Sequence, residues 1–227
     1  MKKYTVNEFA KLIDHTYLKP FAREVDLIKL CNECREYEFA MAAINSYPTA
    51  LCHQLLKGSK VHVGAAIGFP LGQTCIDVKV YETELAIKHG ADEIDYVLNI
   101  GKLIDDDLDY IRTEMQSIKE VCDVHGVILK VIFETCYLSK EQIIKAALIA
   151  KEVQPDFIKT STGFGTAGAT VENVRLMKET VGEKVKVKAS GGIKDLKTML
   201  AMLDAGAERI GTSSSVSIIN EYKEYIG

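Results

Sequence analysis

Short β-type segments alternate with longer amphipathic segments along this chain of 227 residues, and this alternation most restricts its possible folds. Strand–helix–strand units form right-handed crossovers and a parallel sheet. No linker or low-complexity segment interrupts the pattern, so we expect one domain over residues 1–227. The expected strands are a weak one at Leu12–Asp14 and clearer ones at Phe39–Ile44, Val61–Ile67, Glu93–Leu98, Val127–Phe133, Phe157–Lys159, Val185–Lys188 and Arg209–Gly211.

Amphipathic segments between these strands predict the helices. Two of them end on a glycine directly before the next strand, at His89-Gly90 and at Ala205-Gly206, a frequent way for a helix to stop. The expected helices include Val78–His89, Leu108–Val124, Glu141–Glu152, Val171–Val181 and Leu196–Ala205.

A closed (β/α)8 TIM barrel and an open doubly wound sheet both fit such an alternation. A dinucleotide-binding open sheet would carry G-x-G-x-x-G after its first strand, where this chain has Asp14-His15-Thr16. Polar and glycine-rich segments instead follow the strands along the whole chain, and a barrel builds its active site from the loops at those positions. We therefore predict an α/β protein with a single (β/α)8 barrel.

Composition excludes several functional classes. The chain has 28 Lys and Arg against 32 Asp and Glu, a net charge of −4, and it has no basic tract, so nucleic acid is not an expected partner. Charged residues interrupt every hydrophobic run well short of a membrane span. The six cysteines are typical of free thiols in a reducing compartment, and we expect a cytoplasmic protein.

The sequence offers no convincing metal ligands. Cys31 and Cys34 form one CxxC inside a charged helical pattern, without a second pair or a nearby histidine. The five histidines show neither HxH nor HExxH spacing, and no G-x-S-x-G elbow is present. We expect neither a metal nor another cofactor.

Two lysines near strand ends indicate amine chemistry. Lys159 ends a short apolar strand before a glycine-containing loop, which would place it at the barrel mouth. In the next strand, Val185 and Val187 alternate with lysines, so valines packed on the helices direct Lys188 inward beside Lys159. Two neighbouring ammonium groups favour a neutral amine near pH 7, and a neutral amine can attack an aldehyde. The alternative for Lys159 alone is a solvated lysine at a strand end.

Carboxylates on an earlier strand would face these lysines. Strand alternation puts Glu93 and Asp95 on the inner side, with Asp95 nearer the mouth as a candidate proton shuttle. A purely structural buried ion pair is the competing interpretation of Asp95. We also predict that Glu93 is buried against Lys130 or Lys186, leaving Asp95 free, with Lys186 as the least secure member.

The last two strands lead into loops typical of phosphate sites. One loop reads Ala189-Ser190-Gly191-Gly192-Ile193 and the other Gly211-Thr212-Ser213-Ser214-Ser215, each before an expected helix. Glycines let the backbone approach a phosphate, and helix N-termini favour anions. In TIM barrels the loops after strands seven and eight are the usual phosphate site.

Motifs along most of the chain, taken together, resemble those of the deoxyribose-phosphate aldolases. The resemblance runs from Ile13 to about Val216, and K-T-S-T-G-F with V-K-A-S-G-G-I are its most specific parts. The matching segments are Ile13–Thr16, Gly68–Gly72, Glu93–Val97, Lys130–Thr135, Phe157–Phe164, Val187–Ile193 and Ile210–Ser214.

The resemblance implies a class I aldolase that reversibly cleaves 2-deoxy-D-ribose 5-phosphate to D-glyceraldehyde 3-phosphate and acetaldehyde. It assigns Lys159 as the Schiff-base lysine, Asp95 and Lys188 to proton transfer, and Asp14 and Lys130 to the site lining. Where some members carry a cysteine this chain has Asn45, so inhibition through such a cysteine is not expected. The implied phosphate-binding residues are Gly163, Gly191, Gly192, Gly211, Ser213 and Ser214.

Two other functions fit a phosphate-binding barrel. One is a sugar-phosphate isomerase without a covalent step, and the other is a barrel that only binds a sugar phosphate. The expected partners are therefore small sugar phosphates and aldehydes, and the resemblance leaves a homodimer or a higher homo-oligomer open.

Overall fold

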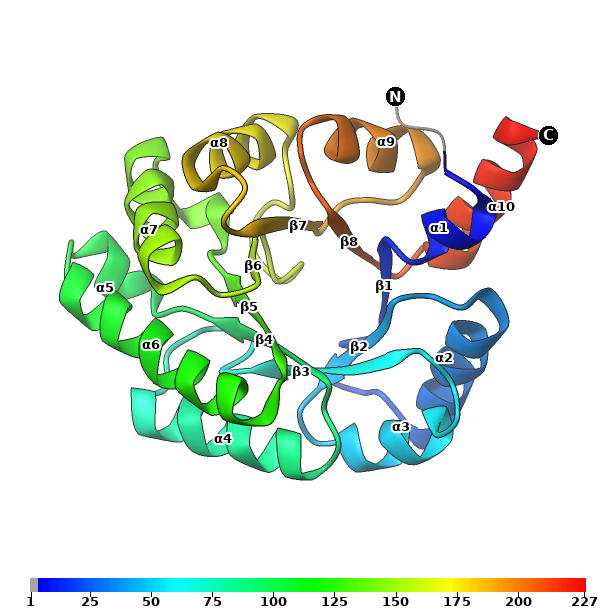
Figure 1. Ribbon diagram of the computed structural model, residues 1–227, viewed down its shortest axis with the longest axis horizontal. Coiled ribbons are helices and arrows are strands. Elements are labelled where there is room, and N and C mark those ends of the chain that lie inside the picture. Colours follow the sequence, from blue (N-terminus) through cyan, green and yellow to red (C-terminus); the bar gives the residue numbers. More distant parts are fainter. Residues whose placement is uncertain (1–3) are drawn as a thin grey trace.

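The computed structural model describes residues 4–227 and contains a closed barrel of eight parallel strands, in which β1 pairs with both β2 and β8. Figure 1 shows the strands at the centre, enclosed by helices. The predicted TIM barrel is confirmed. The strands are β1 (Ile13–Thr16), β2 (Met41–Asn45), β3 (His62–Ile67), β4 (Glu93–Val97), β5 (Ile128–Ile132), β6 (Phe157–Lys159), β7 (Lys186–Ser190) and β8 (Arg209–Thr212).

Helices follow the strands around the outside of the barrel (Figure 1). The short α1 precedes β1 and packs on the C-terminal helix, where the rings of Phe9 and Tyr222 stack with centroids 3.7 Å apart. The helices are α1 (Val6–Ala10), α2 (Glu24–Tyr37), α3 (Thr49–Leu56), α4 (Ile76–Lys88), α5 (Ile100–Ile104), α6 (Leu108–His125), the 3-10 turn η1 (Thr135–Tyr137), α7 (Lys140–Val153), α8 (Val171–Val181), α9 (Leu196–Asp204) and α10 (Ser215–Ile226).

The predicted strands and helices all occur, with bounds displaced by two residues or fewer. β6 and α8 begin and end where the sequence predicts. The two glycine stops are also confirmed, because Gly90 and Gly206 have φ values of +95° and +106°, which residues with a side chain rarely adopt.

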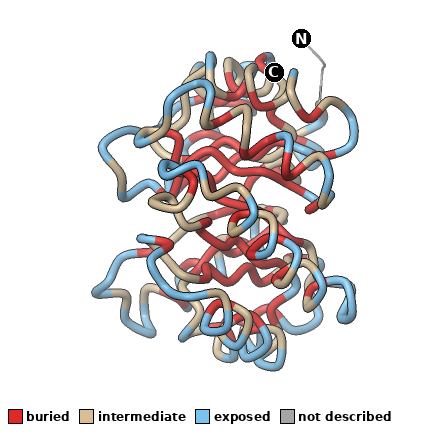
Figure 2. Tube along the Cα trace, turned by 90° about the vertical axis from the view of Figure 1, so that its left-hand side faces the viewer, coloured by how far each residue is buried: buried red, intermediate tan, exposed pale blue. Residues whose placement is uncertain are grey.

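Alternation along the strands separates two environments. On β4, Ile94 and Tyr96 join the apolar core between the strands and the helices, as do Val185 and Val187 at β7. Figure 2 shows how completely the strands are buried. The other face of each strand points into the barrel, where a typical TIM barrel has branched aliphatic side chains. Here that face carries charges, including Glu93, which is fully buried.

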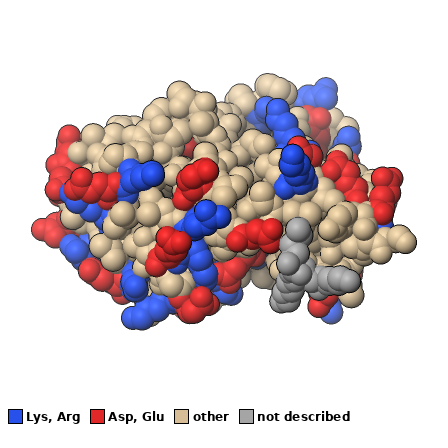
Figure 3. Space-filling view, turned by 90° about the horizontal axis from the view of Figure 1, so that it is seen from above, with Lys and Arg blue, Asp and Glu red and all other residues tan. Residues whose placement is uncertain are grey.

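The CxxC pair is part of the buried core. Cys31 and Cys34 are both 0% exposed in α2. Within residues 4–227, no group of three or more His, Cys, Asp or Glu is arranged to hold a metal ion. No helix in that range is both long and apolar enough for a membrane crossing. On the face drawn in Figure 3, acidic and basic side chains are interspersed.

Candidate active site

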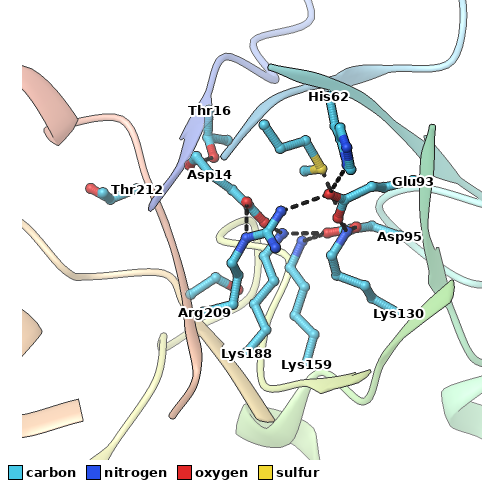
Figure 4. Close-up of polar contacts among 12 residues, drawn as sticks. Asp14, Thr16, His62, Glu93, Asp95, Lys130, Lys159, Lys188, Arg209 and Thr212 are labelled. Carbon is cyan, nitrogen blue, oxygen red and sulfur yellow. Dashed lines mark hydrogen bonds and ion pairs between the residues drawn. The ribbon is translucent and has the colours of Figure 1, made fainter. Parts of the chain in front are cut away.

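The barrel closure brings the sequence-predicted residues together at one level inside the barrel. Strand pairing puts Lys159 of β6 beside Lys188 of β7, and Asp95 of β4 beside Lys130 of β5. Asp14 of β1 reaches the same group from the far side of the barrel (Figure 4). All five side chains are at most 4% exposed, so their charges interact with little screening by water.

Asp95 lies at the centre of this cluster. Its Oδ2 atom accepts hydrogen bonds from the ammonium groups of Lys159 at 2.8 Å and Lys188 at 2.6 Å, and its Oδ1 atom accepts one from Lys130 at 2.7 Å. Burial by itself would raise the pKa of Asp95, but the three lysines hold it well below its usual range. The expectation that Asp95 stays outside the ion pairs is therefore wrong, because β5, β6 and β7 bring all three lysines within hydrogen-bond distance of it; its role in proton transfer stays a prediction.

Lys159 has a pKa well below the ordinary lysine value. Burial is the largest cause and, with a smaller contribution from the Lys188 charge, lowers the pKa of Lys159 to about 8, although Asp95 opposes the shift. At pH 7 roughly one molecule in ten then carries a neutral Lys159 amine. The predicted effect of Lys188 on the pKa of Lys159 is present, but desolvation lowers this pKa more than Lys188 does.

A second layer of charges lies next to the first. Glu93 is 0% exposed and forms an ion pair with Lys130, as predicted. It also accepts hydrogen bonds from His62 Nδ1 at 2.7 Å and from Arg209 Nη2 at 2.7 Å. Although burial works in the opposite direction, these partners lower the pKa of Glu93, with Lys130 contributing most. Glu93 is thus an ionised carboxylate in the barrel interior.

Lys186 does not belong to this network, contrary to the prediction. It lies at the exposed start of β7, with its ammonium nitrogen 5.5 Å from the centre of the Phe157 ring. Arg209 bridges the network instead, because its Nε atom is also 2.5 Å from Asp14 Oδ1. Alternation along β8 puts Arg209 on the same strand face as Gly211. That face points into the barrel, since a Cβ added to Gly211 would lie 3.2 Å from Lys188 Cε. Alternation could therefore have identified Arg209 as an inward-facing residue.

A cavity of about 760 Å³ opens above Lys159 at the carboxyl ends of the strands. The Lys159 side chain forms part of its floor, whereas Asp95 and Lys188 lie beneath and do not line it. Three further cations line the wall and were not predicted from the sequence: Lys19, Lys29 and Lys194. All six predicted phosphate-binding residues line this cavity: Gly163, Gly191, Gly192, Gly211, Ser213 and Ser214.

Glycine backbone shapes one side of the cavity. Gly163 and Gly191 have φ values of +86° and +82°, and an added Cβ on Gly191 would lie only 3.0 Å from the Cα of Gly168. A side chain at Gly191 would push apart the loops that follow β6 and β7. On the neighbouring side, Ser214 directly precedes α10, whose N-terminal amide groups favour an anion. The cavity therefore combines a reactive amine with features that suit a phosphate.

This fold and this site define an enzyme of the TIM-barrel class, with its reactive groups at the carboxyl ends of the strands. A family model described as DeoC/LacD family aldolase matches residues 9–218. The chain belongs to this family of aldolases, which are lyases.

Similarity to individual proteins agrees with this assignment. A deoxyribose-phosphate aldolase of Lactobacillus acidophilus is 55% identical over 221 residues, which cover 97% of this chain and 93% of that protein. One from Bacteroides thetaiotaomicron is 51% identical over 220 residues, covering 97% and 92%. The structure of the tetrameric deoxyribose phosphate aldolase from Aeropyrum pernix superposes with a TM-score of 0.91 at 29% identity, covering 97% of this chain and 93% of the other.

The Glu93 network generates a stability prediction. Replacing Glu93 by Gln leaves Lys130 and Arg209 without their shared carboxylate, and breaking a buried ion pair from one side costs about 3–5 kcal/mol. We expect E93Q to lower the free energy of unfolding, measured by urea denaturation, by about 3 kcal/mol or more. The matched control is E183Q, because Glu183 is exposed and pairs only loosely with Lys178 at 3.6 Å. Equal stability of the two variants would contradict the network.

The lysine pair generates a pH prediction. Replacing Lys188 by Leu removes a positive charge that lowers the pKa of Lys159, so the neutral amine should appear only at higher pH. We expect the pH–rate profile of K188L to shift toward alkaline pH, with a lower rate at neutral pH. K186L is the control, since it removes an exposed lysine from the same strand. An unshifted K188L profile would refute this electrostatic role, whatever happened to the rate.

Proposed function

We propose that the protein catalyses the reversible cleavage of 2-deoxy-D-ribose 5-phosphate to D-glyceraldehyde 3-phosphate and acetaldehyde through a Schiff base on Lys159. The observation that carries the proposal is the Lys159 amine itself, which is buried, has a pKa lowered to about 8 and lines the cavity with the glycine-rich loops. The printed names of the two relatives that are 55% and 51% identical support the choice of substrate.

The covalent steps use one nitrogen atom. The neutral amine of Lys159 adds to the aldehyde carbon of the open-chain sugar and gives a carbinolamine, which loses water to form an iminium. The iminium withdraws electrons as the bond between sugar carbons 2 and 3 breaks, while the hydroxyl on carbon 3 loses its proton. Glyceraldehyde 3-phosphate leaves, and an enamine of acetaldehyde remains on the lysine. Protonation of the enamine and addition of water then release acetaldehyde and the free amine.

Asp95 and Lys188 are the proposed proton carriers. Both Lys159 and Lys188 donate to the same oxygen of Asp95, so a proton can pass from one nitrogen to the other through that carboxylate. When Lys159 is neutral, one of the three charges that lower the pKa of Asp95 is gone, and Asp95 becomes a stronger base at that stage. General acid–base help of this kind typically contributes about 10²–10⁴-fold to the rate.

Other residues hold the substrate and the charge balance, although Asp14 and Lys130, which were expected in the site lining, do not line the cavity. Asp14 contacts the Lys188 ammonium at 2.5 Å, and Lys130 contacts Asp95, so we propose that both support the proton carriers from below. The glycine and serine loops after β6, β7 and β8 would bind the phosphate at the cavity wall. Binding energy from the phosphate then positions the aldehyde carbon over the amine.

We further propose that residues 1–227 work as one barrel domain, as a homo-oligomer in the cytoplasm. The tetramer named for the Aeropyrum pernix protein supports assembly from identical subunits. Free buried thiols, such as those of Cys52 and Cys122, support a reducing compartment.

Borohydride trapping tests the covalent step. With acetaldehyde and borohydride, we expect a reduced ethyl adduct on the tryptic peptide that contains Lys159, detected by mass spectrometry. K159A should lose both this adduct and cleavage activity but keep its circular dichroism spectrum. Isomerisation of a sugar phosphate without a trapped lysine would point to a non-covalent isomerase, and cleavage without a trapped lysine would point to a metal-assisted reaction. Binding of the sugar phosphate without any reaction would point to a binding protein.

A charge placed at the phosphate loops tests the binding site. Ser213 is exposed in the cavity wall, so S213D should repel the phosphate and raise KM for 2-deoxyribose 5-phosphate at least tenfold while leaving unphosphorylated deoxyribose unaffected. S213N, which is nearly the same shape, should have a much smaller effect. Equal changes with both substrates would place the phosphate elsewhere. Gly211 is a poorer probe, since a side chain there would contact Lys188.

A further inference from the structure

Glu134, two residues after the end of β5, differs from the rest of the chain in its backbone conformation and its burial. Among residues 4–227, four non-glycine residues have positive φ values, and Glu134 at +56° is the buried one, with 2% exposure; Glu38, Asp106 and Gln154 are exposed. A left-handed conformation is unfavourable for a residue with a side chain and persists where surrounding contacts enforce it. Glu134 does not line the cavity, and no role was predicted for it from the sequence.

Both carboxylate oxygens of Glu134 contact Thr162 in the loop after β6, and the carboxylate also has a hydrogen bond with Cys136. Its Oε1 atom accepts a hydrogen bond from the Thr162 backbone N–H at 3.1 Å, and its Oε2 atom bonds the Thr162 hydroxyl. The same hydroxyl accepts from the Phe164 backbone N–H at 3.0 Å. The carboxyl group of Glu134 therefore fixes both the main chain and the side chain of Thr162.

Thr162 lies between the two parts of the site. Three residues before it is Lys159, and directly after it is Gly163, one of the cavity-lining glycines. On the opposite side the loop packs on the loop after β7, where Ala169 N–H donates to the carbonyls of Ser190 and Gly191 at 3.0 and 3.1 Å. The loop after β6 is thus held from the β5 side by Glu134 and from the β7 side by backbone contacts.

We propose that Glu134 is a positioning residue, which acts through Thr162 to fix the Gly163 wall of the phosphate pocket relative to the Lys159 amine. The proposal rests on the proposed function, because it assumes that the phosphate binds at this wall. Glu134 touches no substrate in this account. Its removal should weaken binding of a phosphorylated substrate, whereas loss of its charge alone should have a small effect on that binding.

The test compares E134A, E134Q and the control E141A, since Glu141 is an exposed carboxylate on nearby α7. E134A removes both hydrogen bonds, and we expect KM for 2-deoxyribose 5-phosphate to rise about tenfold with little change in kcat. E134Q keeps the shape and an acceptor for the Thr162 N–H, so it should restore KM to within about threefold of the unmodified protein. E141A should leave KM unchanged.

Borohydride trapping of acetaldehyde on Lys159, measured over a range of pH and compared with KM, distinguishes a positioning role of Glu134 from an effect of its charge on Lys159. Because the Glu134 carboxylate also interacts with the Lys159 charge, E134A and E134Q should change the pH midpoint for adduct formation on Lys159 alike, whereas the rise in KM should be large in E134A alone. If E134Q raised KM as much as E134A, Glu134 would act by its charge, and the positioning role would be overturned. Equal KM changes for phosphorylated and unphosphorylated deoxyribose would overturn it as well.

A second pair of variants tests the same proposal in case E134A does not fold. T162V removes the hydroxyl that bonds Glu134, while T162S keeps it, so T162V should raise KM for the phosphorylated substrate and T162S should not. An unchanged KM in T162V would contradict the proposal. Failure of the proposed function would be seen separately, as absence of any Lys159 adduct in the unmodified protein.

Discussion

The carboxylate of Asp95, held between three lysine ammonium groups, is the interaction on which the rest of the site depends. An isolated buried charge costs several kcal/mol, and a pairing geometry with short hydrogen bonds is what makes it tolerable. Asp95 provides this geometry for Lys130, Lys159 and Lys188 at 2.6–2.8 Å. It thereby allows three cations to lie side by side inside a barrel that would ordinarily be filled with aliphatic side chains.

The charge balance of the whole cluster explains why one lysine can lose its proton. With His62 left aside, the carboxylates are Asp14, Glu93 and Asp95, and the cations are the buried Lys130, Lys159 and Lys188 and the partly buried Arg209, so full ionisation leaves one positive charge in excess (−3 against +4). The excess disappears when one lysine is neutral. Carboxylate partners raise the pKa values of Lys130 and Arg209, whereas the pKa of Lys159 is lowered to about 8, so loss of the Lys159 proton can remove the excess.

The sequence predicted the barrel and the inner position of Lys159, Lys188 and Asp95 because strand alternation is a local property of the chain. It could not predict which partners meet across the barrel. Arg209 comes from β8 and binds Glu93 of β4, a contact between residues 116 positions apart, while Lys186 stays at the exposed start of its strand. Glu134 could not be predicted for a related reason. Its left-handed backbone and its bonds to Thr162 depend on how two loops pack, and the hydrophobic periodicity of the sequence does not encode that packing.

A direct measurement of the Lys159 pKa tests the central claim, that burial inside this charge cluster yields a neutral amine near physiological pH. In protein labelled with 13C at the lysine ε-carbons, the Lys159 resonance can be assigned by its absence from K159A and followed by NMR through a pH titration. The cluster predicts a midpoint near 8, well below the ordinary lysine value of about 10.4. A Lys159 midpoint at or above the ordinary value would contradict the account.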